Sequence, residues 1–337
     1  MSRGTHHGRN SHPTRIGITG LGMHVPSKVL TNFDIEKMVD TSDEWIRTRT
    51  GIRERRVAEP GTTTSDLAYK AAHEALKQAH LDPKDLELMI VATTTPDMLF
   101  PSTSCLVQQR LGAKSAVCFD LSAACSGSVF AMITAQQYLL SGRYRNALVV
   151  GAEVLSSFID CTDRSTCILF GDGAGACVLA PVKRGGILAT DMGSDGSAAD
   201  LLYMPGGGSK HPPSHRSVDQ RLHFLRMNGG EIFKLAVRRM ADSAKRVIKD
   251  ARIKPEEVEC FIPHQANVRI IEAVAKFAHL PIEKVYMNLQ RYGNTSAASN
   301  LIALYEAVQE GVVKRNDRVV MVAFGAGLTW GSLLLQW

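Results

Sequence analysis

Three residues of different chemical types stand where apolar segments give way to helical patterns. Cys125 lies in the sequence DLSAACSGS, His264 in FIPHQAN and Asn294 in RYGNTSAAS. A thiol, an imidazole and an amide in such positions suit acyl transfer, because a cysteine thiolate can attack a thioester while His and Asn donate hydrogen bonds to developing oxyanions. The same three residue types also serve papain-like proteases, in which Asn orients His.

Small residues surround Cys125, which permits a tight turn and lets a bulky substrate approach. A helix is predicted to begin there, and its free N–H groups favour a thiolate, lower the pKa of the thiol and offer donors to an oxyanion. The alternative is that Cys125 is a buried apolar residue, which is the interpretation we keep for the other six cysteines. Proteolysis is the weaker second function, because the chain lacks a C-G-S-C-W context.

The elements that must position these residues alternate between strand and helix patterns. Strands are predicted at 16–22, 88–92, 147–150, 177–179 and 318–323. Helices are predicted at 64–80, 126–141, 231–251, 268–279 and 297–311, where apolar residues recur at i, i+3 and i+4. Alternation of this kind indicates βαβ units around a mostly buried sheet, and the glycines and prolines of residues 206–216 indicate a loop.

An internal repeat relates two distant segments. Residues 81–92 (LDPKDLELMIVA) align without a gap to residues 253–264 (IKPEEVECFIPH). Both segments end a helix, pass through a Pro and enter an apolar strand, so Ala92 and His264 are predicted at equivalent strand ends. The bland alternative is a chance similarity between two βα units.

A second pair of segments, 119–142 and 287–311, repeats less sharply as strand, small-residue turn, helix and final Gly. Cys125 and Asn294 lie at the same distance from those final glycines, which predicts that they occupy equivalent turns. If a pseudo-twofold axis relates the two halves, these turns face each other.

Composition and charge exclude several classes of protein. The 337 residues are 45% hydrophobic with a net charge of +6, and the seven cysteines show no paired short spacings. A chain of this length buries a core without disulfides, so we expect a reduced, cytoplasmic protein. Residues 1–15 are basic and lack the apolar run of a signal peptide, which predicts a disordered tail. Without its three Arg the net charge is about +3, too small to favour nucleic-acid binding.

Neither a membrane span nor a metal site is predicted. The uncharged runs 121–142 and 319–337 are long enough to cross a bilayer, but Ser and Gln interrupt the first and Gly the second. A core helix and a pair of strands explain them better. His6, His7 and His12 have no Cys or acidic neighbours in the tail, so no metal is expected there.

Seven segments taken together resemble the β-ketoacyl-acyl carrier protein synthase III family, the condensing enzymes that start type II fatty-acid synthesis. They are TSDEWIRTRTGIRER, FPSTSCLVQQRLG, DLSAACSGSVFA, GDGAGACVL, IPHQANVRI, RYGNTSAAS and FGAGLTWGS. The resemblance runs from about Ile16 to Trp337 and leaves out only the tail and the loop at 206–216. As an ordered set these segments are highly specific, although each alone would be weak.

The resemblance implies a thiolase-like α/β fold with five layers, αβαβα, built from two similar halves at 16–187 and 188–337. It also implies a homodimer that condenses an acyl-CoA with malonyl-acyl carrier protein and releases CoA and CO2, with no cofactor. The length and branching of the acyl primer are not implied. An acyltransferase or secondary-metabolite ketosynthase of the same fold is the alternative, and a non-catalytic protein that binds acyl groups or carrier protein is the remote one.

Residue roles follow from the same resemblance. Cys125 would accept the acyl group, His264 and Asn294 would promote decarboxylation, and the backbone N–H groups of Cys125 and Gly325 would form the oxyanion hole. Phe100 would enter the acyl pocket of the partner subunit. The residues expected to bind CoA are Trp45, Arg49, Arg164 and Asn267. Those expected to bind the carrier protein are Gln265, Ala266, Asn267, Val268 and Arg269, with Lys276 nearby. Gly230 departs from the family pattern, which expects a polar or basic residue there.

Overall fold

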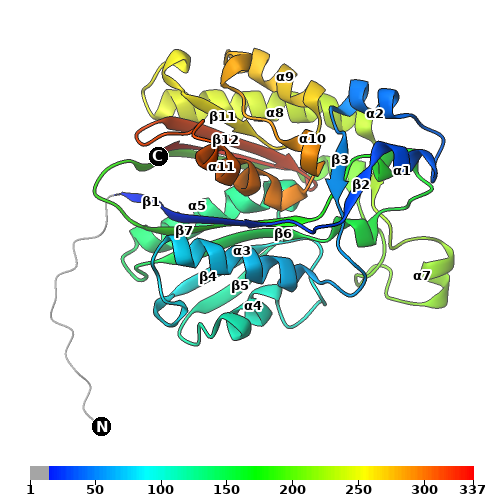
Figure 1. Cartoon of the computed structure of the whole chain (residues 1–337), viewed down its shortest axis with the longest axis horizontal. Helices are drawn as coiled ribbons and strands as arrows, with labels where there is room; N and C mark the ends of the chain where they lie inside the picture. Colours follow the sequence, from blue (N-terminus) through cyan, green and yellow to red (C-terminus); the bar gives the residue numbers. More distant parts are fainter. Residues whose placement is uncertain (1–14) are drawn as a thin grey trace, which may run out of the picture.

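Two sheets are stacked with helices between them and on both outer faces, which makes five layers (Figure 1). The computed structural model describes residues 15–337, so all of the predicted tail except Arg15 lies outside the described residues. The predicted five-layered arrangement is confirmed. It follows from two sheets that are apolar on both faces and therefore need cover on each side.

Each sheet takes its strands from one part of the chain. The larger has the order β1-β7-β6-β4-β5, with β1 Ile16–His24, β4 Leu88–Ala92, β5 Val117–Leu121, β6 Ala147–Glu153 and β7 Gly173–Pro181. The smaller has the order β11-β12-β13-β8, with β8 Gly186–Ser194, β11 Cys260–Pro263, β12 Arg318–Gly325 and β13 Thr329–Gln336. Two short ribbons are β2 Val29–Thr31 with β3 Glu54–Arg56, and β9 Leu202–Tyr203 with β10 Arg226–Met227.

The helices divide between the central layer and the outside. The central layer holds α5 Gly127–Leu140 and α11 Ser299–Gln309; the larger sheet is covered by α3 Thr64–Gln78 and α4 Thr103–Leu111, and the smaller by α8 Gly229–Asp250 and α9 Val268–Phe277. The others are α1 Asn32–Glu36, α2 Asp43–Thr50, α6 Arg164–Cys167, α7 His215–Asp219 and α10 Leu289–Tyr292. α5 carries no charged residue because both sheets cover it, whereas α8 is amphipathic because one face meets water.

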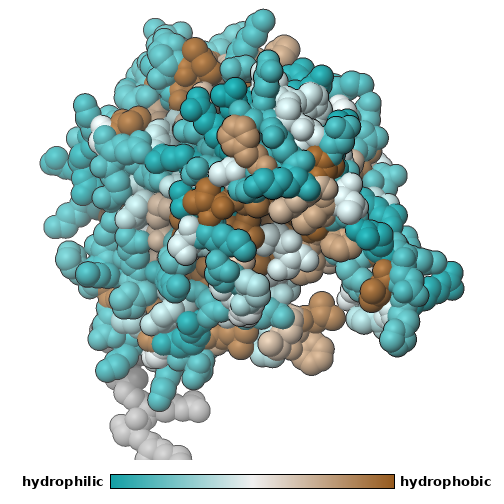
Figure 2. All heavy atoms as spheres, turned by 45° about the vertical axis from the view of Figure 1, so that its right-hand side comes forward, coloured by the Kyte–Doolittle hydropathy of each residue, from teal (hydrophilic) through white to brown (hydrophobic). Residues whose placement is uncertain are grey.

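The segment around α7 stands apart from the layers. It lies at the right of Figure 1, and Figure 2 shows that its surface is mostly hydrophilic. The loop predicted at 206–216 is present as far as Ser214, and its last two residues begin α7 at His215. The Ser214 hydroxyl accepts a hydrogen bond from the N–H of Ser217, which caps this short helix.

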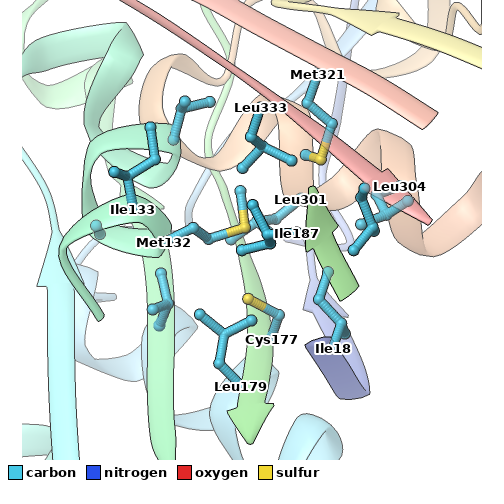
Figure 3. Packing of buried hydrophobic residues seen from close by; sticks show 14 of the residues in the cluster. Ile18, Met132, Ile133, Cys177, Leu179, Ile187, Leu301, Leu304, Met321 and Leu333 are labelled. Atoms are coloured by element: carbon cyan, nitrogen blue, oxygen red, sulfur yellow. The ribbon is translucent and has the colours of Figure 1, made fainter. Parts of the chain in front are cut away.

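The central layer packs tightly against both sheets. Figure 3 shows side chains from α5, α11, β7 and the smaller sheet converging in one apolar cluster. Contact with the larger sheet is closer still, because two of its strand residues are glycines. A Cβ on Gly151 would lie 2.2 Å from the carbonyl oxygen of Ala297, and one on Gly175 would lie 2.6 Å from Cβ of Leu301. Therefore the turn before α11 rests directly on the backbone of β6, and α11 itself rests on that of β7.

The structure corrects the second repeat. The short 3-10 turns Ala124–Ser126 and Ser296–Ala298 precede α5 and α11 and pack against each other. Ala124 and Ser296 share an unusual left-handed conformation, with φ of 47° and 46°. Their separation along the chain equals that between 81–92 and 253–264, so one gapless register relates both pairs of segments. Cys125 is therefore equivalent to Ala297, and the predicted equivalence with Asn294 is wrong by three residues.

Candidate active site

Cys125, His264 and Asn294 line a single cavity, as their chemistry predicts. The cavity encloses about 770 Å³ of empty space, part of which is open to solvent. Cys125 lies in the turn before α5, His264 directly follows β11, and Asn294 lies two residues before the turn that precedes α11. The apolar wall of the cavity is formed mainly by Ile232, Phe233, Ala236, Met240, Ile270 and Phe324.

Gly325 lies against the backbone of Cys125. A Cβ placed on Gly325 would be 2.6 Å from the backbone nitrogen of Cys125 and 3.1 Å from that of Ser126. Any side chain at this position would therefore fill the space in front of the Cys125 N–H. The missing side chain keeps open the space that an oxyanion hole requires.

The thiol of Cys125 is harder to ionise than the sequence suggests. Burial raises its pKa to about 12; a hydrogen bond with Ser296 opposes this shift, and the nearby Glu153 carboxylate adds to it. The expectation of a lowered pKa is therefore wrong, because desolvation of a buried thiol outweighs the effect of the helix N-terminus. At neutral pH the thiol is protonated, so it must lose its proton as it attacks.

Glu153 is a site residue that sequence reasoning missed. It ends β6 and is completely buried. Its carboxylate accepts hydrogen bonds from the hydroxyls of Thr95, at 2.7 Å, and Ser296, at 3.1 Å, and from the N–H of Thr94, at 3.1 Å. Burial raises its pKa as well. The signal that could have revealed it is an acidic residue that ends the otherwise apolar run ALVVGAE.

His264 is a buried, neutral imidazole. Burial lowers its pKa to about 4, so the ring is uncharged at neutral pH. Its Nδ1 atom lies 2.6 Å from Oγ of Ser299. The other ring nitrogen, Nε2, is therefore the one that can interact with a substrate in the cavity that His264 lines.

Asn294 is held through both its backbone and its side chain. Its N–H donates to the carbonyl of Leu169 at 2.8 Å, and its own carbonyl accepts from the N–H of Gly171 at 3.0 Å. Its Oδ1 atom accepts from the N–H of Ser296 at 2.9 Å. Because Oδ1 is engaged, the Nδ2 group is the part of the amide that can donate into the cavity.

A second cavity also reaches Cys125. It encloses about 600 Å³ of empty space, is lined by Thr95 and Ser296 beside the thiol, and is otherwise mainly apolar. The apolar wall is formed by Leu155, Phe158, Phe170, Leu202, Tyr203, Met204 and Leu225. Its walls come from segments far apart in the sequence, so no local sequence pattern predicts it. Cys125 thus lies between two cavities.

The residues expected to bind CoA are largely brought together. The guanidinium carbons of Arg49 and Arg164 lie 5.0 and 4.9 Å from the centre of the Trp45 ring. Both arginines are exposed, whereas Trp45 is half-buried. Asn267 lines the first cavity, at the start of α9, and α2, which carries Trp45, packs against α9.

The stretch expected to bind the carrier protein divides into buried and exposed residues. Gln265 is 1% exposed, and its side chain bonds to the backbone of Pro263, Tyr286 and Asn288. The prediction that Gln265 contacts a partner is therefore wrong for its side chain. Arg269 is exposed, and its guanidinium lies 5.8 Å from the ring of Phe233, which lines the first cavity.

Phe100 lies in an exposed apolar loop. Its relative exposure is 84%, and its neighbours Met98 and Leu99 are 48% and 77% exposed. Figure 2 shows hydrophobic surface gathered in the middle and at the lower edge of the face turned toward the viewer. Contiguous exposed apolar residues of this kind are typical of a surface that another molecule covers.

Two further predictions bear on the class of protein. Within residues 15–337, no three His, Cys, Asp or Glu side chains are grouped as a metal site would require. The histidines of the predicted tail lie outside the described residues. No helix in the described part of the chain has both the length and the apolar composition needed to cross a bilayer.

A Cβ on Gly230 would meet only Oδ1 of Asn228, at 4.0 Å, so this departure from the family pattern leaves open space.

Comparisons with known proteins agree on one family. Residues 119–196 match the family model described as 3-oxoacyl-[acyl-carrier-protein] synthase III, and residues 248–337 match its C-terminal model. The beta-ketoacyl-[acyl-carrier-protein] synthase III of Caldanaerobacter subterraneus subsp. tengcongensis is 54% identical over 322 residues, which cover 95% of this chain and 97% of that protein.

Solved structures are similar over the same length. The crystal structure of 3-oxoacyl-[acyl-carrier-protein] synthase III from Aquifex aeolicus VF5 is 51% identical with a TM-score of 0.89, covering 96% of this chain and all of that one. The priming beta-ketosynthase from the R1128 polyketide biosynthetic pathway is 34% identical with a TM-score of 0.90, covering 98% of both chains.

Proposed function

Because the chain belongs to the β-ketoacyl-acyl carrier protein synthase III family, the acyltransferases that initiate fatty-acid synthesis on a thiolase-like fold, we propose that it condenses an acyl-CoA with malonyl-acyl carrier protein through an acyl-Cys125 intermediate. The observation that carries this mechanism is the meeting of Cys125, His264 and Asn294 in one cavity. All steps use this chain's residues and the two thioesters, so no cofactor enters the proposal.

In the first half-reaction the sulfur of Cys125 attacks the carbonyl carbon of the acyl-CoA. The thiol proton leaves as the new C–S bond forms and ends on the sulfur of CoA, whose bond to the acyl carbon breaks. Charge develops on the carbonyl oxygen, where the N–H groups of Cys125 and Gly325 would bind it. The open space beside Gly325 supports this assignment.

In the second half-reaction malonyl-acyl carrier protein loses CO2. The electrons of the broken C–C bond move onto the thioester, and its oxygen takes the negative charge of an enolate. Nε2–H of His264 and Nδ2–H of Asn294 would donate to that oxygen. A neutral imidazole suits this role, because it donates a hydrogen bond without giving up its proton. The enolate carbon then attacks the acyl-Cys125 carbonyl, and the sulfur of Cys125 leaves and takes up a proton from water.

The residues around the two cavities offer separate binding places for CoA, the carrier protein and the acyl chain. Trp45 with Arg49 and Arg164 offers a flat ring and two cations for the nucleotide of CoA. Arg269, beside the Phe233 ring that lines the first cavity, offers a cation for an acidic carrier. The second cavity offers an apolar space for the acyl chain. At about 600 Å³ it has room for a short acyl group such as the acetyl group of acetyl-CoA.

A homodimer completes the proposal. β5 is the edge strand of the larger sheet and is partly exposed, so its free backbone groups could pair with a second copy. Phe100, in its exposed apolar loop, would then reach the acyl cavity of the partner.

The two half-reactions provide the test. Intact-protein mass spectrometry with a panel of acyl-CoAs should show one acyl group on wild type and none on Cys125→Ala. His264→Ala and Asn294→Ala should acylate within a few-fold of wild type but decarboxylate malonyl-acyl carrier protein about 100-fold more slowly. Wild-type decarboxylation in either variant would refute its role.

The similarity to a priming polyketide synthase keeps a secondary-metabolite ketosynthase as the second candidate. The same acyl-CoA panel tests this alternative: failure to accept any short primer efficiently would favour the secondary-metabolite ketosynthase.

A further inference from the structure

We propose that Ser299 is a positioning residue for the condensation: its hydroxyl donates to Nδ1 of His264 and so keeps the ring proton on Nε2. The inference rests on the proposed function, because the position of this proton matters only if His264 donates a hydrogen bond to the malonyl thioester.

The two side chains form an isolated buried pair. Oγ of Ser299 and Nδ1 of His264 are 2.6 Å apart, and the two residues are 2% and 3% exposed. A neutral imidazole carries its single proton on either Nδ1 or Nε2, and the hydrogen bond made by one nitrogen decides which. The direction of this one bond therefore determines what His264 presents to the cavity.

The hydroxyl proton of Ser299 decides that direction. Among residues 15–337, His264 is the only hydrogen-bond partner found for the Ser299 hydroxyl. If Nδ1 carried the ring proton and donated to Oγ, the hydroxyl proton would be buried without an acceptor, which is costly. If the hydroxyl donates to an unprotonated Nδ1, both groups are satisfied. The ring proton then resides on Nε2.

The backbone holds the pair in this arrangement. The N–H of His264 donates to the carbonyl of Val322 at 2.8 Å. The side-chain amide of Asn300, the residue after Ser299, donates to the same carbonyl at 3.3 Å and to that of Ile262 at 3.0 Å. The first turn of α11 and the end of β11 are thus tied to the same strands, so Ser299 has little freedom to move away from the ring.

The chemical consequence is confined to one half-reaction. With its proton on Nε2, His264 donates to the enolate oxygen that forms as CO2 leaves. With its proton on Nδ1, it would instead direct a lone pair toward that oxygen and repel it. Transfer of the acyl group to Cys125 uses the backbone donors of Cys125 and Gly325, so it does not depend on the tautomer.

Rates of the two half-reactions in Ser299→Ala test this division. The variant should decarboxylate malonyl-acyl carrier protein about tenfold more slowly, while its self-acylation by acetyl-CoA stays within twofold of wild type. Ser299→Thr retains the hydroxyl and should recover most of the lost rate. Ser243→Ala is the matched control, because Ser243 is also 2% exposed and bonds to Asp191, outside both cavities. Both of its rates should remain near wild type.

The tautomer can be read directly and does not depend on activity. In protein labelled with ¹⁵N-histidine, the resonance absent from His264→Ala identifies His264. Wild type should show an unprotonated Nδ1 and a protonated Nε2, and Ser299→Ala should show a mixture.

A protonated Nδ1 in wild type would overturn the inference, and so would equal loss of both half-reactions in folded Ser299→Ala. A proton on Nδ1 would also remove the Nε2–H donor assigned to His264, but it would leave the condensation itself in place. The proposed function is tested separately: it fails if Cys125 takes up no acyl group or if His264→Ala decarboxylates normally.

Discussion

The hydroxyl of Ser296 links the carboxylate of Glu153 to the thiol of Cys125. It donates a hydrogen bond to the carboxylate at 3.1 Å and is also hydrogen-bonded with the thiol. An acidic side chain buried this close to a nucleophile opposes its ionisation, because a thiolate would bring a second negative charge into a site with little water. The protein thus holds its reactive sulfur in the protonated form.

Replacing this carboxylate should make Cys125 more reactive toward simple electrophiles. Glu153→Gln removes the negative charge, so the pKa of Cys125 falls and its thiolate fraction between pH 8 and 9 rises. Alkylation by iodoacetamide should accelerate several-fold, which peptide mass spectrometry would follow residue by residue. Glu306→Gln removes another mostly buried carboxylate, one that is bonded to Asn288, and should leave the rate unchanged. Slower alkylation in a folded Glu153→Gln protein would contradict the account.

Acid should destabilise the protein through His264. Its pKa is about 4 when folded and 6.5 for the free side chain, so between these values the unfolded chain binds a proton that the folded one does not. The stability present above pH 6.5 is therefore lost progressively as pH falls toward 4, by about 3 kcal/mol in total. Urea unfolding at pH 7 and pH 5 should show a smaller difference for His264→Gln than for wild type. An unchanged difference would mean that His264 is not held neutral by burial.

One added methyl group should remove the oxyanion hole. In Gly325→Ala the new Cβ would lie 2.6 Å from the nitrogen of Cys125, so self-acylation by acetyl-CoA should fall at least 100-fold. Gly196→Ala is the control, because no atom lies within 4 Å of a Cβ there. Melting temperatures of both variants separate loss of chemistry from loss of fold. Near-normal acylation by folded Gly325→Ala would place the oxyanion hole elsewhere.

Reversing the charge of Arg269 should affect only the carrier protein. Arg269→Glu should raise the KM for malonyl-acyl carrier protein about tenfold, more at low salt than at high salt, and leave self-acylation by acetyl-CoA unchanged. Lys77→Glu reverses a charge on α3, which covers the larger sheet, and should change neither the KM for malonyl-acyl carrier protein nor the rate of self-acylation. If both rates fall equally in Arg269→Glu, the residue serves CoA or the fold instead.

The sequence predicted those features that depend on local patterns. The gapless match of 81–92 to 253–264 placed His264 at a strand end, and β4 was predicted with its observed bounds. β13 was predicted only as the second strand of the pair in 319–337, without its bounds, because its run TWGSLLLQ gives no clear alternation. α4 was not predicted, because its polar residues blur its helical period. A local sequence pattern identifies a helix or strand only when the apolar residues of its buried face recur at a regular spacing.

Errors at the site have a different cause. The helix start suggested an easily ionised Cys125, yet the tertiary fold buries the thiol beside Glu153, and desolvation depends on chain segments that no local window contains. Gln265 stands in a matching motif, but the fold turns its amide inward to the backbone of Pro263 and Tyr286. Residue type and order indicated which chemistry is present, while burial decided how each group behaves.

The contacts that α11 and the turn before it make with the bare backbone at Gly175 and Gly151 bear on how substrates are exchanged. The segment that presents Asn294 and Ser299 packs on the sheet that carries the nucleophile, and at these two glycines the sheet has no side chain that could yield. We therefore expect the two parts to stay together while one thioester leaves and the next enters. Substrates should therefore enter and leave by way of the two cavities, and Leu202 lines both of them. Selection among acyl donors should respond to changes in the cavity walls rather than to changes in the contact between α11 and the sheet.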